Sequence, residues 1–416
     1  MKAASIVIPF IPGDGIGPEI MGAAQSVVNQ AVAQAYHETR EIKWKPALAG
    51  QQAFNQTGSY LPDETLRIFE KYPTGLKGPL TTPIGGGFRS LNVQIRQSLD
   101  LYACVRLIRW FEGLPSPHRN PEGIDIAVFR ENTEDIYIGI EYEASSKEHK
   151  RFLEGFQKSQ PEDYNRIPTP SACGIGIKPI SKNGSQRLVQ ASLDWALKNN
   201  RKRVTLVHKG NIMKYTEGAF RNWGYDTAET DYSKSVFTRR MYTKIKNEES
   251  IDQAEERKQN ALKEGKLWVD DVIADVVFEQ LITHPQEFDV LATTNLNGDY
   301  LSDASAALAG GVGISPGGNI NYHKGTAIFE ANHGSAEDLA GKNKANPSSL
   351  ILSAEMMLRY ISWTEAADLI WVGIQKTIQE KTVTFDLARQ IVGAQAIGTK
   401  EFAQAITKTF FKEQHH

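Results

Sequence analysis

Five polar side chains near a run of glycines are suited to binding a small anion with several charges. The stretch from Gly85 to Arg106 reads GGGFRSLNVQIRQSLDLYACVR, and FRENTEDIY follows further along the chain. The five side chains are those of Ser90, Asn92, Arg96, Arg106 and Arg130. A guanidinium pairs with a carboxylate through two parallel hydrogen bonds, so the set predicts a site for a small polycarboxylate. Any one of these arginines alone is better explained as a surface ion-pair partner, and the prediction depends on the whole set.

The elements around these side chains favour the same kind of ligand. Glycine has no Cβ atom, so three consecutive glycines allow the backbone to approach a ligand closely. Leu91, Ile95 and Leu99 recur at helical spacing and predict a short helix. Ser90 stands at the N-cap of this helix, which also carries Arg96. Because the N-terminus of a helix attracts negative charge, the helix supports an anion site.

Two carboxylates further along the chain are candidate metal ligands. Asp299 and Asp303 are four residues apart at the start of a predicted helix, so they project from one face. Mg²⁺ and Mn²⁺ prefer such hard oxygen donors. Acidic residues also gather at helix starts without any metal, and the pair alone favours that explanation. Asp275 is a possible third ligand that the sequence alone does not bring close.

Bulk composition indicates a globular enzyme rather than a nucleic-acid or membrane protein. The 416 residues predict two or more lobes, and the formal net charge of −2 gives no basic footprint for nucleic acid. No apolar run has the length of a membrane span, and the N-terminus lacks the features of a signal peptide. The two cysteines, Cys104 and Cys173, have no metal-ligand spacing and indicate a reducing compartment. We therefore expect a cytoplasmic location.

Predicted strands and helices alternate along the chain, which indicates an α/β fold with a largely parallel or mixed sheet. A strand at residues 5–11 leads into GDGIGPEI, whose glycines are Gly13, Gly15 and Gly17. Their GxGxG spacing is not that of a Rossmann dinucleotide motif, and no acidic residue follows a second strand at the required distance. We exclude a Rossmann fold and interpret the motif as a tight strand-to-helix turn near a ligand.

Residues 144–171 differ in composition from the sequence on either side. Charges cluster in SKEHKRFLEG, and prolines recur after it. The pattern predicts an inserted interaction arm or, equally well, an irregular surface loop.

Taken together, the motifs resemble those of the isocitrate/isopropylmalate dehydrogenase family, and most closely its bacterial-type isocitrate dehydrogenases. They run from GDGIGPE through SLNVQIR, FRENTEDIY, HKGNIMKYTEG and NLNGDYLSD to KTVTFD, and SLNVQIR is the most specific. The resemblance implies that family's α/β fold, with a mixed sheet, two lobes and a clasp arm. Residues 1–101 and 310–416 would form a large domain, residues 102–144 and 181–309 a small dimer-forming domain, and residues 145–180 the clasp arm.

The resemblance also implies a role for each polar side chain. Ser90 and Asn92 would contact the additional carboxylate of isocitrate, while the three arginines bind its other carboxylates. Tyr137, on a predicted extended stretch, would be the general acid, and Lys214 would act in the active site of a dimer partner. As single residues both are ordinary. The ligands of Mg²⁺ or Mn²⁺ would be Asp299 and Asp303, with Asp275 contributed across the dimer.

The same resemblance places a nicotinamide cofactor near the C-terminal third of the chain. Asp338 and Leu339 stand where NADP-using members have the lysine and tyrosine that bind the 2′-phosphate. A carboxylate repels that phosphate and accepts hydrogen bonds from free ribose hydroxyls, whereas Arg389 keeps the NADP pattern. We therefore predict NAD, with NADP as the alternative. The cofactor-binding residues would be Thr82, His333, Gly334, Ala336, Asp338, Leu339, Asn346, Asp386 and Arg389.

These predictions describe a homodimeric, NAD- and metal-dependent enzyme that converts isocitrate to 2-oxoglutarate and CO₂. Homoisocitrate or isopropylmalate is the alternative substrate, which Ser90 and Asn92 disfavour. A protein of another class, which binds a polycarboxylate without turnover, is the remote alternative. The presence of Tyr137, Lys214 and the three aspartates argues against it.

Overall fold

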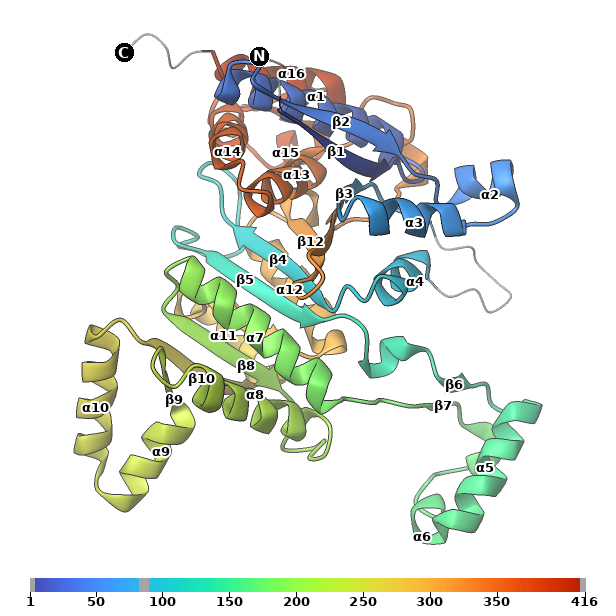
Figure 1. The fold of residues 1–416 in the computed structure, drawn as a ribbon, viewed down its shortest axis with the longest axis vertical. Helices are drawn as coiled ribbons and strands as arrows, with labels where there is room; N and C mark the ends of the chain where they lie inside the picture. The colour runs from blue at the N-terminus through green and yellow to red at the C-terminus, as the bar shows by residue number, and fades with distance from the viewer. Residues whose placement is uncertain (1–3, 82–89, 412–416) are drawn as a thin grey trace.

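One large mixed sheet forms the centre of the molecule (Figure 1). The computed structural model describes residues 4–81 and 90–411. Within them the sheet has 11 strands, in the order β2-β1-β3-β13-β12-β4-β5-β11-β8-β10-β9. In chain order these are β1 (Ala4–Ile11), β2 (Arg40–Pro46), β3 (Thr74–Lys77), β4 (Ala103–Arg109), β5 (Asp125–Glu131), β8 (Arg203–His208), β9 (Val236–Thr238), β10 (Leu267–Ile273), β11 (Val290–Thr293), β12 (Pro316–Asn321) and β13 (Thr326–Ala331).

The strands in the middle of the sheet run in alternating directions. β12 is antiparallel to both β13 and β4, and β4 is antiparallel to β5. The strands on either side of this group pair in parallel. The prediction of an α/β fold with a mixed sheet, and not a Rossmann fold, is therefore confirmed.

Helices cover both faces of the sheet because alternate residues of a strand point to opposite sides. Phe129 and Leu206 pack in one core with α7 and α8, whereas their neighbours Val128 and Val207 pack in another with α11 and α12. These helices are α7 (Lys182–Lys198), α8 (Glu217–Asp231), α11 (Ala274–Thr283) and α12 (Asn295–Leu308).

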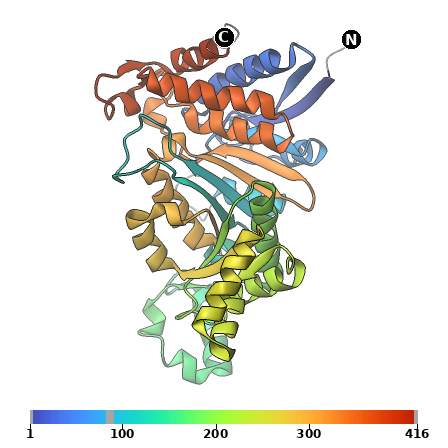
Figure 2. The same cartoon turned by 90° about the vertical axis from the view of Figure 1, so that its left-hand side faces the viewer.

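The two ends of the chain meet at one end of the molecule. Blue and red helices lie side by side there, and the green arm lies at the opposite end (Figure 2). The helices at the shared end are α1 (Gly17–Tyr36), α13 (Ser348–Tyr360), α14 (Thr364–Gln379) and α16 (Thr399–Thr409). The small elements β14 (Thr382–Thr384), α15 (Phe385–Ala388) and β15 (Gln395–Ile397) connect the last two. In residues 4–81 and 90–411, no helix has both the length and the apolar character needed to cross a lipid bilayer.

The segment of unusual composition forms a helical arm rather than an irregular loop. The short strands β6 (Glu141–Tyr142) and β7 (Ile175–Gly176) pair with each other and lead to α5 (Lys147–Ser159) and α6 (Pro161–Tyr164). Both helices stand away from the rest of the molecule (Figure 1). Ser146 caps α5 by accepting a hydrogen bond from the His149 N–H at 3.1 Å. The predicted domain boundaries remain a prediction, since the sheet continues through both predicted lobes.

The remaining helices form two groups. The charged stretch between β9 and β10 forms a hairpin of α9 (Arg239–Glu248) and α10 (Ile251–Lys263). Near β3 lie α2 (Gln51–Thr57), α3 (Asp63–Lys71) and α4 (Leu91–Ser98). α4 is the short helix expected after the glycines, and Ser90 is its N-cap residue.

Candidate active site

A cavity of about 360 Å³ contains most of the side chains that the sequence singled out. It lies beside the antiparallel centre of the sheet and is bordered by α4 and α12. The predicted residues that line it are Ser90, Asn92, Arg96, Arg106, Arg130, Tyr137, Asp299, Asp303, His333 and Gly334. We call this cavity the substrate pocket.

Strand pairing places two of the arginines on one wall of the pocket. In the β4–β5 pair, Arg106 lies opposite Val128, and Arg130 lies opposite Cys104. Paired residues on neighbouring strands point to the same face, and so do residues two apart on one strand. Arg106 and Arg130 therefore share a face, and they are 4% and 3% exposed. A Cβ atom at position 298 would lie 2.6 Å from the Arg130 Cβ, so Gly298 allows α12 to approach this wall.

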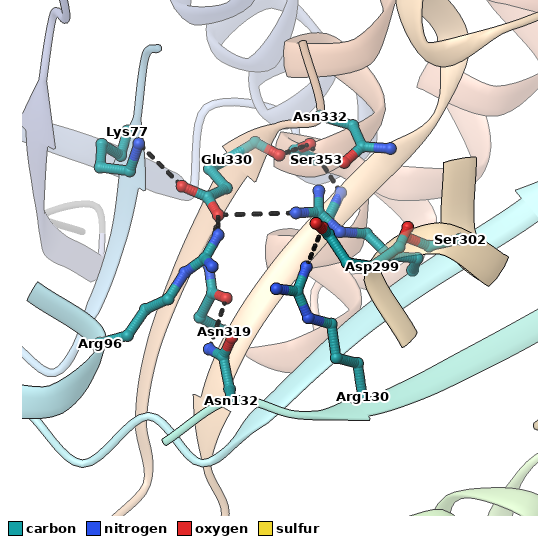
Figure 3. A network of polar contacts seen from close by, with 12 residues as sticks. Lys77, Arg96, Arg130, Asn132, Asp299, Ser302, Asn319, Glu330, Asn332 and Ser353 are labelled. Atoms are coloured by element: carbon teal, nitrogen blue, oxygen red, sulfur yellow. Dashed lines mark hydrogen bonds and ion pairs between the residues drawn. The ribbon is translucent and has the colours of Figure 1, made fainter. Parts of the chain in front are cut away.

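A buried carboxylate holds the cations of the pocket together (Figure 3). Glu330, at the end of β13, accepts contacts at 2.7 Å from Lys77 Nζ and from Arg96 Nη2. Arg106 Nη2 lies 3.7 Å from the same carboxylate, and the Asn319 amide donates to it at 2.7 Å. Burial by itself would raise the pKa of Glu330, but the three cations hold it well below the usual range. Three cations around one anion leave positive charge in the pocket for an anionic ligand.

Several buried donors of the pocket have no partner in the part of the chain that the structure describes. These atoms are Arg96 Nε and both Nε and Nη1 of Arg106. A buried donor without a partner is costly, and a carboxylate is a strong acceptor for a guanidinium. The unpaired atoms therefore fit a ligand that brings carboxylate groups.

Tyr137 is held beside Arg130, whose guanidinium carbon lies 4.8 Å from the centroid of the tyrosine ring. Tyr137 lies on the 3₁₀ helix η1 (Asp135–Ile138), not on the predicted extended stretch, and the first residue of this helix, Asp135, has a positive φ. Its hydroxyl donates to Asp299 Oδ2 at 2.5 Å, and Arg130 contacts the other oxygen of that carboxylate. Burial and the hydrogen bond to Asp299 raise the pKa of Tyr137 to about 12. The phenol is therefore protonated at neutral pH and able to donate a proton.

Two of the three predicted metal ligands lie in the substrate pocket. Asp299 and Asp303 project from α12, and burial followed by the charge of Asp299 raises the pKa of Asp303. A nearby cation would relieve that repulsion, so this pair fits a divalent metal. Asp275 lies on α11 and pairs instead with Lys209. In the described ranges, no three histidine, cysteine, aspartate or glutamate side chains gather as a metal site.

Lys214 also lies outside the substrate pocket of its own chain. It is exposed in the turn between β8 and α8. Neighbouring Ile212 and Tyr215 are 69% and 92% exposed, which is unusual for large apolar side chains. One chain therefore brings together the predicted substrate-binding side chains and two of the predicted metal ligands, but not Lys214 or Asp275.

The turn after β1 joins two loops that border the pocket. The Asp14 carboxylate accepts hydrogen bonds from the Gln51 N–H at 2.8 Å and the Thr81 N–H at 2.9 Å. The Ile16 N–H donates to the Ser335 carbonyl at 2.8 Å. The structure has the predicted tight turn between β1 and α1, and its nearness to a ligand stays a prediction; the role of Asp14 was missed. The role of Glu330 was also missed. The sequence feature that could have indicated it is an acidic residue inside the apolar strand TAIFEA.

The predicted cofactor residues extend from the pocket, which His333 and Gly334 line, to a neighbouring edge. Asp338 and Arg389 are exposed on this edge, which we call the cofactor edge, whereas Asn346 is buried. Burial lowers the pKa of His333, whose Nε2 is buried and unpaired among the described residues. The Asn346 amide donates to the Asp386 carboxylate at 2.9 Å and ties two of the predicted segments together. Ala336 precedes the 3₁₀ helix η5 (Glu337–Leu339) with a φ of 41°. Thr82 lies outside the described residues.

Comparison with known proteins places the chain among the relatives that its motifs indicated. Residues 7–406 match the family model described as isocitrate/isopropylmalate dehydrogenase. A Staphylococcus epidermidis protein named isocitrate dehydrogenase [NADP] is 53% identical over 402 residues, covering 97% of this chain and 95% of that protein. A Streptococcus mutans protein of the same name is 47% identical over 400 residues, covering 96% and 94%. The crystal structure of isocitrate dehydrogenase from Methylococcus capsulatus is 35% identical, with a TM-score of 0.75 and coverage of 97% and 99%.

These relatives contradict the prediction that the chain is an NAD-dependent enzyme. Proteins that are 47% to 53% identical to it are named for NADP. The prediction gave too much weight to Asp338, an exposed side chain whose repulsion of a phosphate is screened by solvent. Lys342 and Lys344 are exposed on the same loop. The loop therefore carries cations as well as the carboxylate on which the NAD prediction depended.

Proposed function

Because the chain belongs to the isocitrate/isopropylmalate dehydrogenase family, we propose that it is an NADP-dependent isocitrate dehydrogenase. The reaction oxidises isocitrate, releases CO₂ and yields 2-oxoglutarate. The proposed substrate rests on the cluster of Arg96, Arg106 and Arg130 in one cavity, where Arg96 and Arg106 have buried donors without a partner among the described residues. The proposed cofactor rests on the relatives that are named for NADP.

The arginines bind and orient the substrate carboxylates. Arg106 and Arg130 reach the pocket from neighbouring strands, and Arg96 reaches it from α4. Ser90 and Asn92 border the same cavity at the start of α4 and contact the carboxylate that isopropylmalate lacks. Fixing the substrate at several points converts binding energy into a reactive orientation.

Proton transfer is divided between two side chains. Tyr137, protonated at neutral pH, donates the proton that the product carbon takes up after CO₂ leaves. Lys214 of a second subunit takes part in removing the hydroxyl proton. Asp299 and Asp303 hold a divalent cation, together with a third carboxylate from the second subunit. Bound Mg²⁺ or Mn²⁺ supplies Lewis-acid stabilisation of negative charge on the substrate oxygens.

The proposed enzyme is a homodimer with shared active sites, because one chain leaves Lys214 and Asp275 out of its own pocket. Lys214 lies between two exposed apolar side chains. Ile282 on α11 and Tyr300 on α12 are 70% and 57% exposed. Exposed apolar side chains grouped on neighbouring elements are typical of a protein interface. The protruding arm of α5 and α6 is the proposed clasp between subunits, and the large and small domains are proposed with the boundaries given above.

One assay tests the reaction. The rate of NADPH formation from isocitrate and Mg²⁺ is measured, then repeated with NAD and with isopropylmalate. We expect isocitrate-dependent NADPH formation and no turnover of isopropylmalate. A higher specificity constant for NAD than for NADP would contradict the cofactor and leave the substrate standing. Turnover of isopropylmalate alone would contradict the substrate.

A mixing experiment tests the shared site. Tyr137→Phe and Lys214→Met proteins, each expected to be inactive, are dissociated reversibly and reassociated together. A hybrid dimer regains one site with both residues, so part of the activity returns. Proven heterodimers without activity would contradict the placement of Lys214 in the partner's site.

A further inference from the structure

A second cavity, of about 580 Å³, lies on the opposite face of the strands that form the substrate pocket. Side chains alternate between the two faces of a strand. On β4, Arg106 faces the substrate pocket and Leu107 lines the second cavity. On β13, Glu330 faces the substrate pocket and Phe329 lines the second cavity. The two cavities are therefore separated by the thickness of the sheet and are distinct sites.

The lining of the second cavity is largely apolar and aromatic. Met356 from α13 and Trp195 from α7 contribute to its walls, together with Tyr322 and Tyr360. Among the described residues, neither tyrosine hydroxyl makes a hydrogen bond. Burial raises the pKa of both phenols, so they are neutral donors at physiological pH. The volume lies in the range of about 300–1,000 Å³ that small-molecule sites occupy.

Charged side chains also line this cavity, and the cations outnumber the anions. The lining cations are Arg109, Lys198, Arg201 and Arg359, and the lining anions are Asp125 and Asp194. Arg201 is bound by Asp125 at 2.8 Å and by Asp289 at 2.9 Å. Arg359 is bound by Glu355 and Asp368 at 2.6 and 2.7 Å.

Two of the lining cations are not matched in this way. Lys198 is exposed at the last turn of α7, and within the described residues it has no ion-pair partner. Arg109 stacks on Trp371, with its guanidinium carbon 3.8 Å from the ring centroid. Its Nη2 lies 3.5 Å from Glu355, and its Nε and Nη2 are buried without a hydrogen bond in the described part of the chain. The cavity therefore combines an apolar wall with an exposed lysine, which has no ion-pair partner among the described residues, and an arginine whose hydrogen-bond donors are only partly used.

We propose that the second cavity binds a small amphipathic organic anion, with its apolar body against Trp195 and Met356 and its anionic group paired with Lys198. An apolar wall favours burial of an aromatic or aliphatic body, since removing that surface from water is favourable. Lys198 attracts the anionic group at the opening, and the tyrosine hydroxyls provide donors inside. This inference does not depend on the proposed reaction.

The probe for this site is 8-anilinonaphthalene-1-sulfonate, an aromatic sulfonate whose fluorescence rises in apolar surroundings. Its dissociation constant and stoichiometry are measured with the full chain. We expect one high-affinity dye per chain. Ala191→Trp fills the cavity from α7, where Ala191 is 4% exposed, and should weaken binding at least tenfold. Wild-type affinity in a folded Ala191→Trp protein would overturn the proposal.

A charge reversal with a matched control tests the anionic group without altering the core. Lys198→Glu and Lys263→Glu both replace an exposed lysine in the last turn of a helix, but only Lys198 lines the cavity. Lys198→Glu should weaken dye binding at least threefold, and Lys263→Glu should leave it unchanged. N-phenyl-1-naphthylamine, which has the same aromatic body without the sulfonate, should not distinguish the two variants. Equal dye affinity in both variants would overturn the pairing with Lys198, and this comparison decides the matter if Ala191→Trp does not fold.

Discussion

The substrate pocket and the cofactor edge are neighbours, but their charges lie in different surroundings. In the pocket, Glu330 and Arg106 are 3% and 4% exposed, and the ion pairs of Glu330 fix three cations. At the cofactor edge, Asp338 and Lys342 are exposed to solvent. A buried charge must find a partner, whereas an exposed charge interacts weakly and is screened by salt.

This difference explains why the sequence indicated one region well and misled in the other. A set of three arginines is compatible with only a few kinds of ligand, and the structure brings Arg96, Arg106 and Arg130 to one cavity. Asp338 is compatible with several cofactors, because its effect depends on the charges around it. The identity of one exposed side chain therefore carries less information than a set of buried ones.

The largest effect is expected from Glu330→Gln. The substitution leaves Lys77, Arg96 and Arg106 buried without their carboxylate, and breaking a buried ion pair in this way costs about 3–5 kcal/mol. Urea unfolding at neutral pH measures the loss of free energy of unfolding. Asp338→Asn is the matched control, since it removes an exposed carboxylate, and should change stability by less than about 0.5 kcal/mol. Equal stability of the two variants would contradict the contrast between the regions.

The pH dependence of that effect has a defined sign. The pKa of Glu330 is well below its usual range in the folded protein, whereas in the unfolded chain it is about 4.3. Its contribution is complete above the unfolded value and is lost as the pH falls through the folded value. The stability difference between the wild type and Glu330→Gln should therefore be constant from about pH 8 to 5 and shrink below about pH 4. A difference that shrinks toward alkaline pH would contradict the assignment.

Arg130→Met should reduce the specificity constant for isocitrate at least about a hundredfold, or roughly 2.7 kcal/mol. The guanidinium contacts Asp299, and its Nε donates to Asn295 at 2.8 Å, so a substrate carboxylate would lose a fixed partner. Arg389→Met at the cofactor edge is the control and should change this constant by less than about fivefold. Steady-state kinetics with varied isocitrate gives both values. Similar losses in the two variants would contradict a role of Arg130 in binding the substrate.

Asp14→Asn should have an intermediate effect, expressed mainly in cofactor binding. The new amide turns a donor toward one of two backbone N–H groups, those of Gln51 or Thr81, and an unpaired buried donor costs about 1–3 kcal/mol. Thr81 contacts Ser335 and Glu337, so the effect should reach the cofactor edge. We expect the KM for NADP to rise about tenfold, with kcat within about threefold. A change confined to kcat would contradict a positioning role.

The smallest effect is expected from Asp338→Asn on cofactor choice. An exposed charge contributes about 0–1 kcal/mol, so the ratio of specificity constants for NADP and NAD should rise by less than about fivefold. Kinetics with both cofactors at low and high salt measures it. A shift well above tenfold would show that Asp338 lies close to the bound nucleotide and that screening is weaker than its exposure indicates.

Much of the candidate site followed from local sequence patterns. Ser90 and Arg96 fall on a helix whose apolar residues repeat at helical spacing, and that helix begins at Leu91. Asp299 and Asp303 share one face of α12 because they are four residues apart. These features depend on bonds and contacts within a few residues, so the sequence by itself determined them. The alternation of strands and helices determined the α/β class in the same way.

Only the tertiary structure decided which distant side chains meet. Glu330 contacts Arg96, 234 residues away, because it lies on the face of β13 that packs against α4. The second cavity likewise depends on which helices cover the other face of β4 and β13. Strand order and helix packing result from burial of apolar surface by the whole chain, and this collective effect has no local signature. The sequence therefore identified the groups that are proposed to bind a polycarboxylate, while the fold supplied the carboxylate that holds them and the cavity behind them.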